Sequence, residues 1–264
     1  MPATVCEDGP MSPSPAETWI IDLDGVVWLA EQPIAGSAEA IGRLREAGIR
    51  VIFATNNAAP TLAEFCTRLG SAGIAADADD LVTSAQAAAS MLEPGTSAFP
   101  CAEGGVVEAL TQQRVKVIDD DPADAVIVGW TRRFDFDLMA KAASLVRAGA
   151  RFIGTNEDPT HPTPRGLLPG SGALIAAVAT AAQTEPEMAG KPHEPMVALI
   201  RRRAPDATLI VGDRPSTDGV LARRLGVPFA LMRSGVTSDG REPMVVEPDE
   251  VAADLAALVE QHLL

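Results

Sequence analysis

Short apolar runs alternate with stretches of helical spacing along most of the chain. A run of roughly four to eight apolar residues is typical of a strand buried on both faces, whereas apolar residues about three or four positions apart are typical of an amphipathic helix. The predicted strands cover residues 18–24, 49–57, the start of 80–92, 114–121, 124–130, 150–156, 207–213 and 227–232. The predicted helices cover residues 37–48, 61–73, the rest of 80–92, 136–149, 173–183, 196–203 and 249–263.

This alternation predicts an α/β fold with a Rossmann-like, mostly parallel sheet. Two loop-rich segments interrupt it, near residues 95 and 186, and they indicate that a second α/β module is inserted into the first. We expect a core domain that combines residues 17–97 with 186–264, and an inserted domain that covers 98–185.

Composition and charge restrict the compartment and the partners. The formal net charge of -15 predicts a surface that repels nucleic acid and anionic membranes. No apolar stretch approaches the ~20 residues that cross a bilayer. Residues 1–16 have no basic region and no long apolar stretch, so we expect a flexible tail rather than a targeting signal. Cys6, Cys66 and Cys101 form no CxxC motif, which argues against disulfides and structural zinc and favours the cytoplasm.

Polar side chains gather at the ends of several predicted strands, and in open parallel sheets ligands bind outside those carboxyl ends. The candidates are Asp22 and Asp24 after the first strand, Thr55 and Asn56 at the end of the second, Asp213 and Asp218 at a late one, and Lys191 in the segment "GKP". Any one of them alone is better explained as a helix cap or a turn former. Their combination is better explained by a functional site.

The charges of these residues predict a metal site and a reaction. Three carboxylates about 4 Å apart repel by roughly 4 kcal/mol per pair at an effective dielectric constant near 20, so a cation is expected among them. Oxygen ligands without His or Cys favour Mg²⁺. A carboxylate beside a metal ion and a lysine is a nucleophile for phosphorus, and it forms an acyl phosphate that water hydrolyses.

These roles can be assigned to single residues. Asp22 would attack, and Asp24, two residues on and on the same side of an extended chain, would transfer protons. Thr55 and Asn56 would donate hydrogen bonds to phosphoryl oxygens, and Lys191 would offset their charge.

The segments "DLDGV", "TNN", "GKP" and "VGDRPSTDG" occur in this order. They resemble the four motifs of the haloacid dehalogenase superfamily of Mg²⁺-dependent phosphatases, and more narrowly its NagD-like, 4-nitrophenylphosphatase-like branch, which carries a large inserted α/β cap. The resemblance extends from about residue 17 to beyond 235. It implies that Asp22 is the nucleophile and Asp24 the general acid and base. It also implies that Asp22, Asp213 and the Asp24 backbone carbonyl bind Mg²⁺, with Asp218 supporting the metal's water shell.

The resemblance also implies how a substrate is chosen. Loops of the cap lie over the site in this family, which here assigns substrate contacts to Asn156, Asp158 and His161 in "GTNEDPTHP". The expected partner is a small phosphorylated metabolite. Glycerol phosphate, phosphoglycolate, a sugar phosphate, a nucleotide monophosphate and pyridoxal phosphate all stay open. Relatives with this cap often pair through it, so a homodimer formed through the cap is one candidate assembly, and the oligomeric state stays open.

A non-enzymatic receiver domain of a signalling system is the main alternative. Receivers also gather acidic residues, a phosphorylatable Asp, a Thr and a Lys around Mg²⁺. They have no large inserted module, and they give no reason for an Asp two residues after the phosphoacceptor. A dinucleotide-binding dehydrogenase is disfavoured because no GxGxxG follows the first strand, and a serine hydrolase because no GxSxG is present.

Overall fold

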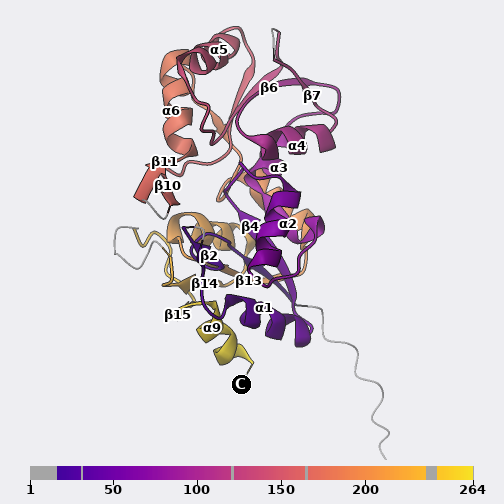
Figure 1. Cartoon of the computed structure of the whole chain (residues 1–264), viewed down its shortest axis with the longest axis vertical. Coiled ribbons are helices and arrows are strands. Elements are labelled where there is room, and N and C mark those ends of the chain that lie inside the picture. The colour runs from indigo at the N-terminus through magenta and orange to yellow at the C-terminus, as the bar shows by residue number, and fades with distance from the viewer. Residues whose placement is uncertain (1–16, 31, 120–121, 164–165, 236–242, 264) are drawn as a thin grey trace, which may run out of the picture.

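A computed structural model describes residues 17–263, apart from residues 31, 120–121, 164–165 and 236–242. The tail predicted for residues 1–16, with Cys6, lies outside the described residues. Two α/β bodies are stacked along the long axis of the molecule, and both the first and the last described segments belong to the lower body (Figure 1). No helix within the described part of the chain is long and apolar enough to cross a membrane.

The lower body, here called the core, is built on a six-stranded sheet, the core sheet, in which all neighbouring strands are parallel. Its order is β15 (Glu250–Ala252), β14 (Phe229–Met232), β13 (Ala207–Gly212), β1 (Thr18–Ile21), β4 (Arg50–Thr55) and β5 (Leu81–Thr83). The first strand of the chain therefore lies in the middle, between β4 and β13. Because the strand order reverses there, ligand sites of open parallel sheets form at this position.

Alternate residues of β1 face opposite sides of the core sheet, as the period of a strand requires. Ile20 belongs to a buried cluster that includes residues of α3 (Ser84–Ala89), α7 (Glu194–Arg203) and α8 (Val220–Leu225). Trp19 and Ile21 belong to a second cluster, with α1 (Ser37–Glu46), α2 (Leu62–Ser71) and α9 (Leu255–His262). The sheet is thus covered on both faces, which explains why its strands read as continuous apolar runs.

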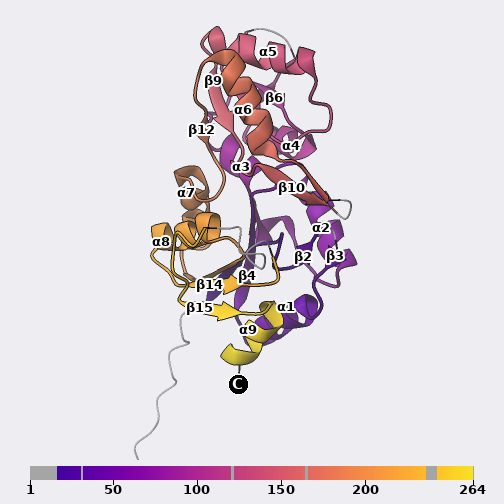
Figure 2. The same cartoon turned by 90° about the vertical axis from the view of Figure 1, so that its left-hand side faces the viewer.

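The upper body, here called the second body, contains a second parallel sheet of five strands. It corresponds to the cap expected from the sequence. Its order is β12 (Glu187–Met188), β9 (Arg151–Gly154), β8 (Ala125–Val128), β6 (Ser97–Cys101) and β7 (Lys116–Val117). Helices α5 (Phe136–Arg147) and α6 (Ser171–Ala182) cover one face (Figure 2). The other face shares one buried apolar cluster with the core through α3 and α4 (Gly104–Gln112).

Two antiparallel hairpins complete the molecule. The hairpin β2–β3 (Trp28–Leu29 and Gln32–Pro33) follows the first strand of the core sheet. The hairpin β10–β11 (Thr160–Thr163 and Gly166–Pro169) leads into α6. Both project toward the junction of the two bodies (Figure 2).

The α/β class with its parallel sheet is confirmed, but several predicted element bounds are wrong. The strand β6 and the helix α4 were not predicted, and residues 157–172, which lie outside every predicted strand and helix, contain the hairpin β10–β11. The helix predicted over 249–263 begins only at Leu255, since Asp254 accepts a hydrogen bond from the Ala257 N–H as an N-cap and β15 precedes it. The predicted domain boundaries, after residues 97 and 185, stay a prediction.

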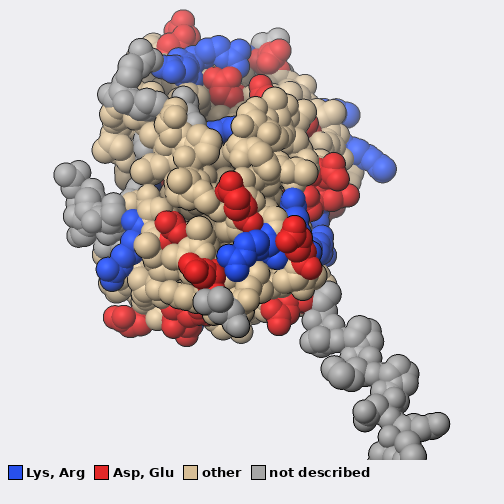
Figure 3. Space-filling model, turned by 60° about the horizontal axis from the view of Figure 1, so that its bottom comes forward, with Lys and Arg blue, Asp and Glu red and all other residues tan. Residues whose placement is uncertain are grey.

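Acidic and basic side chains are interspersed over the described part of the face that the core turns forward in Figure 3. Two ion pairs of the core, Arg45 with Asp80 at 3.7 Å and Arg203 with Asp79 at 3.4 Å, are partly open to solvent. Ion pairs that water can reach contribute little to stability. Stability therefore rests on the buried apolar clusters.

Replacing Phe65 tests this inference. Phe65 on α2 is 1% exposed in the cluster beneath the core sheet, so Phe65→Ala is expected to lower the free energy of unfolding by about 3–5 kcal/mol. Phe136→Ala is the matched control, because its side chain is 75% exposed, and it should change the free energy by less than about 0.5 kcal/mol. Urea unfolding followed by circular dichroism measures both; equal losses would contradict the assignment of the core.

Candidate active site

Three buried carboxylates meet at the carboxyl end of the core sheet. The Asp22 N–H donates to the Val211 carbonyl at 2.8 Å, so the chain after β1 continues beside β13 before it turns away. Asp213 directly follows β13, and Asp218 lies in the π-helical turn Pro215–Gly219. One oxygen from each of Asp22, Asp213 and Asp218 lies within 4.8 Å of the other two. The sequence-predicted cluster is thus assembled by the fold.

Two glycines make this close approach possible. Gly25 has a φ of +93°, and a Cβ at this position would lie 2.3 Å from Oδ2 of Asp213. A Cβ at Gly212 would lie 2.2 Å from Cγ of Asp218. Side chains at either position would collide with a carboxylate, so the glycines of "DLDG" and "VGD" are a steric requirement of the cluster.

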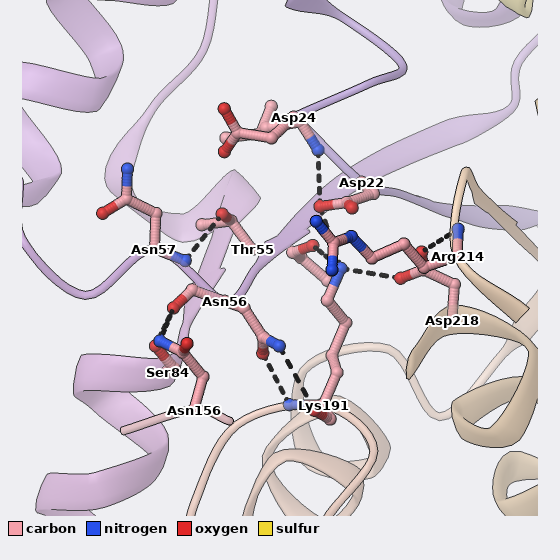
Figure 4. Close-up of polar contacts among 12 residues, drawn as sticks. Asp22, Asp24, Thr55, Asn56, Asn57, Ser84, Asn156, Lys191, Arg214 and Asp218 are labelled. Atoms are coloured by element: carbon pink, nitrogen blue, oxygen red, sulfur yellow. Dashed lines mark hydrogen bonds and ion pairs between the residues drawn. The ribbon is translucent and has the colours of Figure 1, made fainter. Parts of the chain in front are cut away.

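Lys191 is the counter-charge of the cluster. Its Nζ donates to Oδ1 of Asp22 at 2.8 Å, to Oδ1 of Asp218 at 2.7 Å and to the Ala54 carbonyl at 3.0 Å (Figure 4). Burial lowers the pKa of the Lys191 ammonium, but Asp218 and Asp22 outweigh burial and raise that pKa above its usual value. Lys191 therefore remains a cation although it is only 3% exposed.

The charges within the cluster are unbalanced. Burial raises the pKa of the Asp22 carboxyl well above its usual value; Lys191 opposes this effect, while Asp218 and Asp213 add to it. Three carboxylates face one ammonium, which leaves an excess of negative charge in a buried place. Hard oxygen ligands with such an excess fit a divalent cation such as Mg²⁺.

Asn56 holds Lys191 in place. The Lys191 N–H donates to Oδ1 of Asn56 at 2.7 Å, and Nδ2 of Asn56 donates to the Lys191 carbonyl at 3.2 Å. Thr55, at the end of β4, accepts a hydrogen bond from the Asn57 N–H at 3.1 Å through Oγ1. The Asn56 side chain is thus a positioning group in this structure, and its predicted contact with a phosphoryl group stays a prediction.

Asp24 is directed away from Asp22 (Figure 4). Its Oδ1 accepts a hydrogen bond from the indole Nε1 of Trp28 at 3.0 Å. The guanidinium of Arg68 lies over the Trp28 ring, 3.9 Å from its centroid, which is a cation–π arrangement. Trp28, on the hairpin β2–β3, therefore sets the orientation of the Asp24 side chain in this structure.

One cavity opens between the core and the second body, directly beside the cluster. Its lining from the core includes Asp22, Asp24, Thr55, Asn56, Asn57, Lys191, Asp213, Arg214 and Thr217. Its lining from the second body includes Trp130, Asn156, Asp158, Thr160, His161, Gly170 and Ser171. The structure thus brings nine of the ten predicted site residues to one cavity, and the tenth, Asp218, lies behind Lys191.

The residues predicted to contact substrate differ in their geometry. Nδ2 of Asn156 donates to the Asn56 carbonyl at 2.7 Å and to Ser171 Oγ at 3.0 Å, so this amide joins the two bodies. Asp158 Oδ1 lies 3.4 Å from Nη1 of Arg214. Burial raises the pKa of the Asp158 carboxyl, and the opposing effect of Arg214 is smaller. The His161 ring lies 5.4 Å from the Trp130 ring, centroid to centroid.

Sequence reasoning missed Trp130, Ser171 and Arg214. Trp130 lies two residues after β8, and Arg214 follows the predicted Asp213. The rule that ligands bind beyond strand ends applies to both and could have found them. Ser171 begins α6 and carried no such signal.

Comparison with known proteins places the chain in a family. Residues 19–116 match the family described as haloacid dehalogenase-like hydrolase, and residues 188–258 match the family described as HAD-hydrolase-like. A D-glycerol 3-phosphate phosphatase of Mycobacterium tuberculosis is 38% identical over 257 residues, which cover 93% of this chain and 71% of the relative.

Solved structures agree with this placement. A glycerol phosphate phosphatase from Mycobacterium tuberculosis in complex with magnesium is 33% identical, with a TM-score of 0.84 over 92% of this chain and 76% of that one. NagD from Escherichia coli is 31% identical, with a TM-score of 0.79 over 92% of this chain and 98% of its own. The chain therefore belongs to the haloacid dehalogenase-like hydrolases, in the NagD-like group, and is a phosphatase.

Proposed function

We propose that this chain hydrolyses small phosphomonoesters with Mg²⁺ and forms an aspartyl phosphate on Asp22. The observation that carries the proposal is the contact between Asp22 and Lys191 inside a cluster of three carboxylates at the bottom of a cavity. A carboxylate in this setting can attack phosphorus because the ammonium and a metal ion screen the negative charge of the phosphoryl group.

The proposed metal site uses residues that the cluster already brings together. Asp22 and Asp213, with the Asp24 backbone carbonyl, would hold Mg²⁺, and Asp218 would support its water shell. When bound, Mg²⁺ would neutralise the excess charge and polarise the phosphoryl oxygens. The magnesium in the related glycerol phosphate phosphatase supports this choice of metal.

The proposed reaction has two steps. In the first, a carboxylate oxygen of Asp22 forms a bond to phosphorus while the ester oxygen leaves and takes a proton from the Asp24 carboxyl. In the second, Asp24 accepts a proton from water, the water oxygen bonds to phosphorus, and the bond from Asp22 to phosphorus breaks to release phosphate. The Trp28 indole engages Oδ1 of Asp24, so Oδ2 is the oxygen that would transfer the proton unless the side chain rotates.

The phosphoryl group would lie beside Lys191 and the strand end that carries Thr55 and Asn56. The leaving group would then extend toward the cap, where Asn156, Asp158 and His161 line the same cavity. The D-glycerol 3-phosphate phosphatase relative supports a small, hydroxyl-bearing leaving group.

Pairing of two chains through the cap is also proposed, and light scattering of the purified protein tests it.

A receiver-type signalling domain is not favoured. The relatives are phosphatases, and the second body over the site matches them rather than a single-domain switch. Asp24 also has a role in turnover that a switch does not need.

Removing the nucleophile tests the reaction. Asp22→Asn is expected to lower kcat on 4-nitrophenyl phosphate by roughly 10³-fold or more, because an amide cannot form the acyl phosphate. The control is Asp79→Asn, whose side chain is 95% exposed and remote from the cavity lining, and it should keep wild-type kcat. Retained turnover in Asp22→Asn would exclude this nucleophile.

Comparing leaving groups tests Asp24. An alkoxide needs a proton to leave, whereas 4-nitrophenolate does not. Asp24→Asn should therefore lower kcat/KM for glycerol phosphate by about 10²-fold or more, and lower that for 4-nitrophenyl phosphate much less. Steady-state kinetics on both esters measures the difference, and equal losses would remove Asp24 from the protonation of the leaving group.

Metal binding can be tested without turnover. Mg²⁺ at about 100 times its Kd should stabilise the protein by about 2.7 kcal/mol, which raises the melting temperature. Asp213→Asn should remove most of this shift, and Asp79→Asn should keep it. Differential scanning fluorimetry with and without EDTA measures the shift. A wild-type melting temperature that Mg²⁺ leaves unchanged would contradict the proposed site.

A further inference from the structure

The carboxyl group of Asp24 has a partner to which the proposed reaction gives no role. Nε1 of the Trp28 indole donates a hydrogen bond to Oδ1 of Asp24 at 3.0 Å. Asp24 lines the cavity, whereas Trp28 is 1% exposed and is not among the described residues of the lining. Trp28 therefore lies out of reach of a substrate in this structure, and any influence that it has on the reaction passes through Asp24.

The backbone between these two residues fixes their relative position. The N–H groups of Val27 and Trp28 both donate to the Leu23 carbonyl, at 2.9 and 3.1 Å, and the Gly25 N–H donates to the Trp28 carbonyl at 2.6 Å. This tight turn uses the positive φ of Gly25, and it brings the indole beside Asp24. Trp28 also belongs to the buried cluster that contains Leu23 and Val27. The indole N–H is thus a fixed donor, and the Asp24 side chain is the group that it orients.

The chemistry of the indole distinguishes the two oxygens of Asp24. An indole N–H donates and offers no acceptor atom, so the oxygen that faces it is the acceptor. The carbonyl oxygen of a carboxylic acid is the better acceptor, which leaves the proton of the Asp24 carboxylic acid on Oδ2. When that proton is transferred, negative charge develops on the carboxylate, and hydrogen bonds to a charged acceptor are stronger than those to a neutral one. The indole therefore favours the transfer itself as well as its direction.

We propose that Trp28 is a positioning residue for proton transfer by Asp24. Its indole holds Oδ1, so that the bond between Oδ2 and its proton breaks as the ester oxygen takes the proton and leaves phosphorus. In the second step Oδ2 accepts the proton from water, and Oδ1 keeps its hydrogen bond throughout. This inference rests on the role proposed for Asp24 in the phosphatase reaction. It adds a residue outside the cavity to the groups that determine the rate.

Removing the indole N–H tests this inference with two matched esters. Phenyl phosphate and 4-nitrophenyl phosphate share a ring, and phenolate, the more basic leaving group, needs the proton more. Trp28→Phe keeps an aromatic ring in the cluster but no donor. Its kcat/KM for phenyl phosphate should fall by about fivefold or more, and that for 4-nitrophenyl phosphate by less than about twofold. In the background of Asp24→Asn the same substitution should leave the ratio of the two values unchanged, since no carboxylic acid remains to be oriented.

Trp19 provides the matched control. It is 2% exposed and belongs to the same buried cluster, and its ring lies 4.9 Å from the His262 ring, centroid to centroid. Trp19→Phe should therefore keep the wild-type ratio of the two esters. If circular dichroism shows that Trp28→Phe does not fold, a benzothienyl analogue of tryptophan at position 28 replaces only the N–H with sulfur, and it should give the same loss.

Several results would overturn the inference. These are an unchanged ratio in the variants that lack the N–H, an equal loss on both esters, and an equal change in Trp19→Phe. Faster release of phenol by Trp28→Phe would also overturn it, because the indole would then hold Asp24 back. A wild-type ratio in Asp24→Asn would instead refute the proton transfer proposed for Asp24. Absence of turnover of either ester by the wild type would refute the phosphatase proposal, and this inference with it.

Discussion

The contact of one buried ammonium with two buried carboxylates is the constraint on which the site depends. Lys191 enters from the segment that returns from the second body, while Asp22 and Asp218 come from two neighbouring regions of the core. Removing such a charge from water is costly unless it is paired. Asn56 and the Ala54 carbonyl complete the shell around Lys191. The return segment, the first strand and the late strand must therefore all reach their places before the full set of contacts around Lys191 is complete.

The sequence was sufficient to predict this constellation because its residues follow strand ends. Asp22 and Asp213 come after the apolar runs that form β1 and β13, and these strands are neighbours in the core sheet. The carboxyl ends of parallel neighbours meet at one edge, so proximity follows from the class of fold. The glycines of these motifs also have a local physical reason, because the carboxylates leave no room for a Cβ at Gly25 or Gly212.

Other features had no local signal. The strand β6 contains Pro100, which lacks an N–H, and α4 opens with Gly104 and Gly105, which weaken a helical pattern. The hairpin β10–β11 lies in a segment rich in Pro and Gly. The pair of Asp158 and Arg214 joins positions 56 residues apart on different bodies, and only the packing of one body on the other brings them together. Long-range contacts of this kind are a property of the tertiary structure.

The apolar cluster that α3 and α4 share has a consequence for the entry of ligands. Ala88 and Leu92 on the core side belong to the same buried group as Val106 and Leu110 on the other side, so separating the bodies there would expose that group to water. Opening the molecule at this junction would therefore be costly in free energy. Leu29 of β2 and His161 of β10 line the cavity, and a ligand that passed between these two hairpins would leave the shared cluster intact.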